Sequence, residues 1–160
     1  MGDKDSQLSD DTLLVHDERH SENAISPPIY QTSIFSFDSY QAMVDRFSGV
    51  STQAVYSRVD NPTVSVLLDK MCRLEGGEAA AAFSSGIAAI SNTILGLVRA
   101  GDRIVSVKHI YPDTYRLLKG LCARFGITTD FVDGRDLKAI EQAIPGARLL
   151  YLESPNTWVM

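Results

Sequence analysis

The segment Ser84-Ser85-Gly86-Ile87 carries residue types that suit the binding of an anion. Hydroxyls and a glycine at the start of a helix let backbone N–H groups approach a phosphate closely, and the helix dipole favours negative charge there. A plain serine N-cap would use the same residues, so the segment alone leaves both interpretations open. It matches neither the GxGxxG fingerprint nor the Walker loop.

Tyr56 and Arg58 form a second candidate for binding an anion. Two residues apart in an extended chain, a phenol and a guanidinium point to the same side, so both can donate to one phosphate. A packed tyrosine beside a solvated arginine is the alternative interpretation of this pair.

Further candidates follow expected strands. The ring of Tyr111 can stack on a flat ligand, and its hydroxyl can act as an acid or a base. Glu153 and Asn156 follow the last expected strand, at the sheet edge where α/β proteins bind ligands. A core tyrosine and an ordinary strand-end turn would give the same letters.

The elements that must position these residues alternate along the chain. Asn61-Pro62 predicts the start of a helix and Gly76-Gly77 its end. Strands are predicted at 79–83, 104–107, 127–132 and 148–152, and helices at 87–101, 112–125 and 136–144. This alternation predicts an α/β fold with a parallel sheet covered on both faces.

Residues 1–60 lack sustained periodicity but contain an apolar island from Ile29 to Phe35, with Phe37 beyond it. A solvated linker would not need this island, so we expect an extended arm that lies on its own domain or on another subunit. The predicted organisation is an arm at 1–60 and an α/β domain at 61–160.

Composition argues against several classes of function. The net charge is −5, from 15 Lys and Arg against 20 Asp and Glu, so no basic field attracts nucleic acid or an anionic membrane. No apolar run reaches the roughly 18 residues of a membrane span. Cys72 and Cys122 stand apart from each other and from any histidine, which indicates no zinc site or disulfide framework and suits a reducing cytoplasm.

A hydrolase is the rival enzyme class, because Ala82-Phe83-Ser84-Ser85-Gly86 is partly similar to the GxSxG nucleophile elbow. That fold needs an acid and then a histidine downstream. His109 is the only histidine after Ser84 and comes too early for this order, which disfavours a hydrolase.

Taken together, these segments resemble the trans-sulfuration family of pyridoxal-phosphate (PLP) enzymes of cysteine and methionine metabolism, which includes cystathionine γ-synthase, cystathionine β-lyase, cystathionine γ-lyase and methionine γ-lyase. The matching segments run in order along the chain: 27–33, 56–58, 61–63, 74–79, 85–90, 101–102, 114–116 and 151–155.

The resemblance implies the N-terminal part of a fold type I large domain, in a homo-oligomer, such as a homotetramer, whose arms reach into neighbouring active sites. Tyr56 and Arg58 would bind the cofactor phosphate of the partner subunit. The segment Ser85-Gly86-Ile87 would hold the phosphate of the chain's own cofactor. Tyr111 would stack on the pyridine ring and assist proton transfer, and Glu153 and Asn156 would line the cofactor and substrate.

The chain also departs from the family pattern. In the family, the lysine that holds the cofactor, the aspartate paired with the ring nitrogen and the arginine for the substrate carboxylate all lie beyond the segments matched here. None of the five lysines, Lys4, Lys70, Lys108, Lys119 and Lys138, matches that lysine, so we expect the 160-residue chain to be inactive alone. A non-catalytic half-domain that binds phosphate or a partner chain is the alternative.

The substrate class follows from the resemblance. It implies a sulfur amino acid, namely cystathionine, or a homoserine ester with cysteine as the second substrate. Asp113 stands where methionine γ-lyases carry a cysteine, which argues against that activity. We therefore expect a cystathionine β-lyase or a cystathionine γ-synthase.

Overall fold

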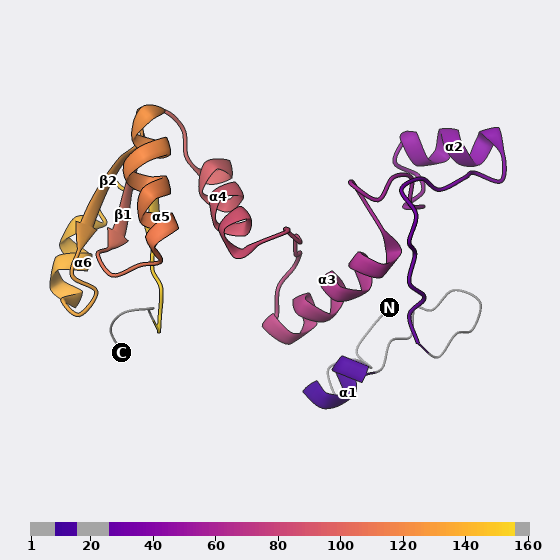
Figure 1. The fold of residues 1–160 in the computed structure, drawn as a ribbon, viewed down its shortest axis with the longest axis horizontal. Helices are drawn as coiled ribbons and strands as arrows, with labels where there is room; N and C mark the ends of the chain where they lie inside the picture. The colour runs from indigo at the N-terminus through magenta and orange to yellow at the C-terminus, as the bar shows by residue number, and fades with distance from the viewer. Residues whose placement is uncertain (1–8, 16–25, 156–160) are drawn as a thin grey trace. The chain divides into compact units, whose positions relative to one another are not determined.

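The computed structural model describes residues 9–15 and 26–155. The chain divides into two compact units, Met1–Ala82 and Phe83–Met160. Figure 1 labels their helices and strands. Of the described helices, none combines the length and apolar character that crossing a lipid bilayer requires.

The first unit contains three helices, α1 (Asp10–Val15), α2 (Tyr40–Phe47) and α3 (Pro62–Glu75). Helix α3 confirms the prediction from the sequence. The Asn61 side chain caps its start, and Gly76 ends it with a φ of 62°, in the left-handed region that glycine adopts without strain. Helices α1 and α3 are in contact through a hydrogen bond of 2.7 Å from Lys70 Nζ to the Leu14 carbonyl.

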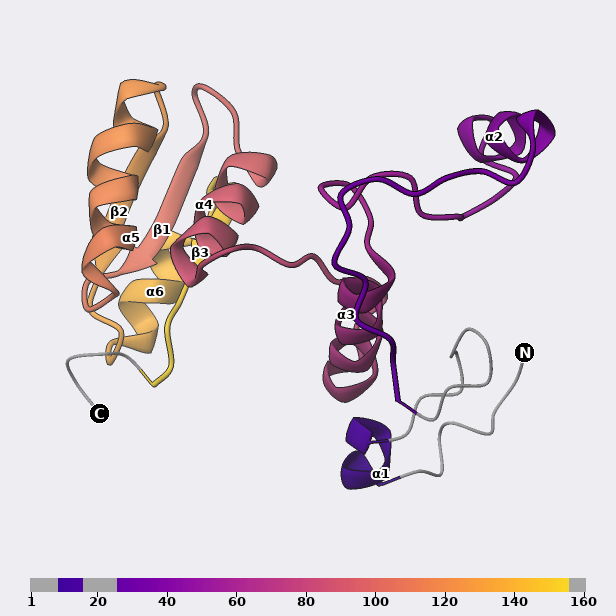
Figure 2. The same ribbon diagram turned by 45° about the vertical axis from the view of Figure 1, so that its right-hand side comes forward.

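The apolar island of the predicted arm runs as extended chain beside residues 53–57, as Figure 2 shows. Ile34 and Tyr56 form an antiparallel bridge, and the Phe35 N–H donates to the Val55 carbonyl at 3.0 Å. The island therefore packs on its own unit along one edge. Ile29 and Ile34 nevertheless remain 78% and 69% exposed.

The second unit is the α/β part of the chain. Its elements in order are α4 (Gly86–Leu97), β1 (Arg103–Val107), α5 (Pro112–Arg116), the π-helical continuation η3 (Leu117–Cys122), β2 (Thr128–Val132), α6 (Leu137–Ala143) and β3 (Leu149–Tyr151). The three strands pair in parallel in the order β2-β1-β3. The chain thus crosses one way through α5 and back through α6, and right-handed crossovers place these helices on opposite faces (Figure 1). The predicted parallel sheet with two covered faces is confirmed.

The core of the second unit forms around the central strand β1. Ile104 and Val105 are fully buried there, because β1 has a neighbour on each side and a helix over each face. Helix α4 contributes Ile94 and η3 contributes Leu118. This packing fixes where β1 ends, and so where the residues that follow it lie.

The prediction of a strand at Ala79–Phe83 is wrong. These residues are irregular and exposed, and none of the described strands pairs with them. A strand exists only where a neighbour completes its hydrogen bonds, and a run of alanines has little β propensity without such a neighbour.

Candidate functional site

The start of α4 forms an open anion cradle. Ser85 is the N-cap, its hydroxyl accepts the Ala88 N–H at 3.2 Å, and its carbonyl accepts the Ala89 N–H at 3.1 Å. The N–H groups of Gly86 and Ile87 belong to the first turn, which has no intrahelical carbonyl to receive them. A Cβ placed on Gly86 would meet nothing within 4 Å, so an anion can reach these groups from solvent. The capping and anion-binding interpretations of this segment are therefore compatible.

Tyr56 and Arg58 lie together, but in a closed turn and not in the extended chain predicted from the sequence. The Val59 and Asp60 N–H groups both donate to the Tyr56 carbonyl, at 2.8 and 2.9 Å, which closes a turn. Within the turn the Arg58 guanidinium lies 5.1 Å from the centre of the Tyr56 ring, a cation–π contact. Both side chains are exposed, so one anion can contact the two of them.

Asn61 anchors this turn to the arm segment. Its side chain is 8% exposed and donates to the Tyr30 carbonyl at 3.1 Å and to the Ser57 hydroxyl at 2.8 Å, while its oxygen accepts the Thr63 N–H at 2.9 Å. The Thr63 hydroxyl adds two bonds to the same segment, to the Pro28 carbonyl at 3.1 Å and from the Tyr30 N–H at 2.9 Å. The sequence indicated Asn61 only as a helix cap. The long-range bonds of its amide had no signal in local spacing.

Tyr111 and Glu153 meet at the carboxyl ends of β1 and β3. The Tyr111 backbone N–H donates to Glu153 Oε2 at 2.8 Å, and the Tyr151 hydroxyl donates to Glu153 Oε1 at 2.8 Å. The Tyr111 ring is 41% exposed and can therefore stack on a ligand. Its pKa is raised, first by a hydrogen bond to the Asp113 carboxylate and then by the negative charge of that group, which makes the phenol a weaker acid.

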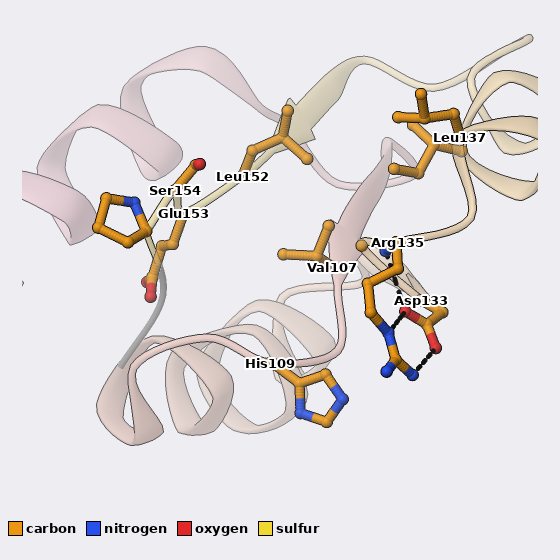
Figure 3. A pocket seen from close by; sticks show the side chains of 11 residues that line it. Val107, His109, Asp133, Arg135, Leu137, Leu152, Glu153 and Ser154 are labelled. Atoms are coloured by element: carbon orange, nitrogen blue, oxygen red, sulfur yellow. Dashed lines mark hydrogen bonds and ion pairs between the residues drawn. The ribbon is translucent and has the colours of Figure 1, made fainter. Parts of the chain in front are cut away.

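A cavity of about 470 Å³ opens beside this edge of the sheet (Figure 3). Its walls come from the ends of all three strands and from α6, with His109 at the rim and Leu137 and Leu152 among the apolar lining. Arg135 bonds Asp133 through two nitrogens, at 2.9 and 3.1 Å, which lowers the pKa of that carboxyl well below its usual range. Asp133 and Arg135 were not among the residues predicted from the sequence, although they lie within three residues of the end of a predicted strand.

The predicted site residues thus fall into three groups. Ser85, Gly86 and Ile87 share the start of α4, and Tyr111 and Glu153 share the sheet edge. Tyr56 and Arg58 share a turn of the first unit. Asn156 lies outside the described residues. Within 9–15 and 26–155, no three His, Cys, Asp or Glu side chains gather in a way that could hold a metal ion.

Comparison with known proteins gives one consistent family. The model of the family described as Cys/Met metabolism PLP-dependent enzyme matches residues 11–160. L-methionine gamma-lyase of Treponema denticola is 40% identical over 86% of this chain and 34% of its own length. Sulfhydrylase FUB7 of Fusarium oxysporum f. sp. lycopersici is 44% identical over 79% of this chain and 30% of its own. The chain therefore spans about a third of the length of these curated relatives.

Solved structures agree with this comparison. A Campylobacter jejuni protein assigned as an O-acetylhomoserine (thiol)-lyase superposes with a TM-score of 0.84 at 28% identity, over 94% of this chain and 38% of its own, and contains N'-pyridoxyl-lysine-5'-monophosphate. Cystathionine gamma-lyase of Lactobacillus plantarum, solved with L-serine, gives a TM-score of 0.78 at 37% identity, over 93% of this chain and 38% of its own. The N-terminal part of the PLP fold type I architecture, expected from the sequence, is confirmed.

We predict that Asn61 stabilises the first unit by cross-linking as well as by capping. Asn61→Ala removes three hydrogen bonds and should lower the free energy of unfolding by about 1–3 kcal/mol. Asn61→Ser keeps a capping oxygen but loses the amide donors, so it should fall between Asn61→Ala and the wild type. Urea unfolding of the three proteins measures this order. A serine variant as stable as the wild type would mean that the cross-links contribute nothing.

Tyr151 should make stability fall in strong alkali. Burial, with a further contribution from the Glu153 carboxylate, raises the pKa of Tyr151 to about 12, against about 10 for an unfolded tyrosine. The folded state then holds the proton more tightly, so this contribution is intact below about pH 10 and is lost as the pH rises towards 12. Urea midpoints across this range should decline less in Tyr151→Phe than in the wild type. Equal declines would contradict the assignment.

Proposed function

Because the chain belongs to the Cys/Met metabolism family of PLP-dependent enzymes, we propose that it is the part of a trans-sulfuration enzyme that holds the phosphate and one ring face of the cofactor. When bound, PLP supplies an electron sink that lets an amino acid lose its Cα proton and then a β or γ substituent. In this proposal, the residues of the chain bind the cofactor and orient it, which is what the protein contributes to such chemistry.

The observation that carries this proposal is the open start of α4. A phosphate ester carries negative charge and several acceptor oxygens, and the Gly86 and Ile87 N–H groups offer two donors at the positive end of a helix. The Ser85 hydroxyl lies at the same place and already accepts the Ala88 N–H, so it can donate its own proton to a phosphate oxygen. The residues present therefore fit the phosphate of PLP.

The Tyr56–Arg58 turn is proposed to bind the phosphate in a neighbouring subunit's site. Support comes from the stacked, exposed pair and from the Asn61 bonds that hold the turn in place. A preorganised guanidinium loses less side-chain entropy when it binds a phosphate. We also propose that the arm, residues 1–60, lies against another subunit of a homo-oligomer. The exposure of the apolar side chains of Ile29 and Ile34 favours this proposal.

Tyr111 is proposed to stack on the pyridine ring and to move a proton at its hydroxyl. The exposed ring suits stacking on a flat ligand. The hydroxyl can hold a proton for transfer, although Asp113 raises its pKa and so makes release of that proton harder. Glu153 and Asn156 are proposed to lie at the lining of the cofactor and substrate. Both oxygens of Glu153 already accept hydrogen bonds, from the Tyr111 N–H and the Tyr151 hydroxyl. Glu153 would therefore act on the cofactor through the backbone of Tyr111, which it holds in place.

The proposed substrate is a sulfur amino acid, in a cytoplasmic enzyme. The free thiols of Cys72 and Cys122 suit that reducing compartment. Relatives are named methionine gamma-lyase and sulfhydrylase, so C–S bond chemistry is common to them. Within this class we propose a cystathionine β-lyase or γ-synthase, because a carboxylate, Asp113, ion-paired to Arg116 at 2.7 Å, takes the place of the cysteine expected in a methionine γ-lyase.

A charge placed in the cradle should weaken phosphate binding. Gly86→Asp adds a carboxylate where a Cβ meets no atom within 4 Å, so the chain should fold normally while the new charge repels the phosphate. Like charges about 4 Å apart repel by roughly 1–4 kcal/mol, so PLP affinity should fall at least about fivefold. Calorimetric titration with PLP measures this.

The matched control is Gly96→Asp, in the same helix and equally free of neighbours. It should bind PLP like the wild type. Equal affinity of the two variants would refute the cradle.

A further inference from the structure

Glu153 joins two neighbouring strands at the edge where Tyr111 emerges. It follows β3, and its carboxylate reaches the loop after β1, where it accepts the Tyr111 N–H at 2.8 Å. The bond spans 42 residues of sequence and depends on the parallel pairing of the two strands. Figure 3 shows the Glu153 side chain at the edge of the cavity beside this loop.

The carboxylate binds the backbone at the start of a helix that has no local side-chain cap. Tyr111 is the N-cap residue of α5 and has no side-chain capping bond of its own, and Pro112, the first helical residue, has no N–H. A negative charge at this end of a helix is favourable, and a hydrogen bond to a charged acceptor is stronger than one to a neutral acceptor. Ser85 and Asn61 accept N–H groups inside the first turns of α4 and α3, whereas Glu153 accepts the N–H of the N-cap residue Tyr111 and so fixes the residue at which α5 starts.

A second bond fixes the carboxylate itself. The half-buried Tyr151 hydroxyl donates to the other oxygen at 2.8 Å, so the carboxylate is held from both sides. With Oε1 on Tyr151 and Oε2 on Tyr111, rotation of the carboxylate would break one bond or both. The backbone from which the Tyr111 ring projects is thereby held in one position.

We propose that Glu153 is a positioning residue, which orients the Tyr111 ring by holding its backbone N–H and is itself held by Tyr151. The consequence for the cofactor depends on the proposed function, whereas the hydrogen bond does not. Loss of Glu153 should leave the phosphate cradle intact and free the ring that faces the cofactor.

Hydrogen exchange at the Tyr111 amide tests the bond directly in the chain without cofactor. Glu153→Ala should reduce the protection of this amide by about 10- to 100-fold, the factor that corresponds to a hydrogen bond to a charged acceptor. Glu153→Gln keeps one carbonyl oxygen and should recover part of the protection. Glu141→Ala, which removes an exposed carboxylate from α6, is the matched control and should leave this amide unchanged.

Circular dichroism of bound PLP tests the consequence. An oriented chromophore acquires an induced signal, so Glu153→Ala should lose most of the signal per bound cofactor and Glu153→Gln should restore part of it. The signals are compared at full PLP occupancy, so that a change in PLP affinity does not count as a change in the orientation of the ring.

The outcomes separate the two claims. Unchanged Tyr111 protection in Glu153→Ala, or an unchanged induced signal at full PLP occupancy, would overturn the positioning role. Loss of protection in a chain that does not bind PLP would support the positioning of Tyr111 and count against the proposed function instead.

Discussion

Strand β1 pairs in parallel with both β2 and β3, and this pairing brings together the segments that follow the three strands. Parallel strands place their carboxyl ends on one edge, where α/β proteins bind ligands. Tyr111, Arg135 and Glu153 reach that edge from different parts of the chain, and the cavity forms between their segments. The burial of Ile104 and Val105 in β1 keeps the edge fixed relative to the helices that cover the sheet.

The starts of α3, α4 and α5 hold most of the proposed site residues. At each start, the backbone N–H groups have different hydrogen-bond partners. Asn61 caps α3 and also binds the arm, so the cap fixes the Tyr56–Arg58 turn. Ser85 caps α4 and leaves the next two N–H groups facing solvent, which makes that start suitable for a phosphate. The α5 start has no side-chain cap, and Glu153 binds the N–H of its N-cap residue, Tyr111. Backbone N–H groups at a helix start need acceptors, and this need is met in three ways. Asn61 anchors the arm at α3, the α4 start is open to an anion, and Glu153 holds Tyr111 at α5.

Caps, glycines and apolar runs in the sequence predicted the helix ends and the strands that depend on neighbouring residues. Asn61-Pro62 and Gly76 mark both ends of α3, and apolar runs mark the three strands. The run at Ala79–Phe83 carried a similar signal and was wrong, because a strand also requires a partner that no local pattern reveals. The closed turn after Tyr56 and the π-helical segment Leu117–Cys122 were missed for a related reason: both depend on hydrogen-bond registers that spacing does not encode. The Glu153–Tyr111 hydrogen bond could not be predicted without knowing that β1 pairs with β3.

We propose that this chain holds the cofactor through phosphate and ring contacts, while none of its lysines bonds to the cofactor. The most direct test is borohydride reduction of the chain with PLP, followed by peptide mass spectrometry and compared with an excess of competing phosphate. We expect phosphate to displace bound PLP, and we expect saturable labelling at none of Lys4, Lys70, Lys108, Lys119 and Lys138. One of these lysines labelled stoichiometrically, with phosphate suppressing the label, would contradict it.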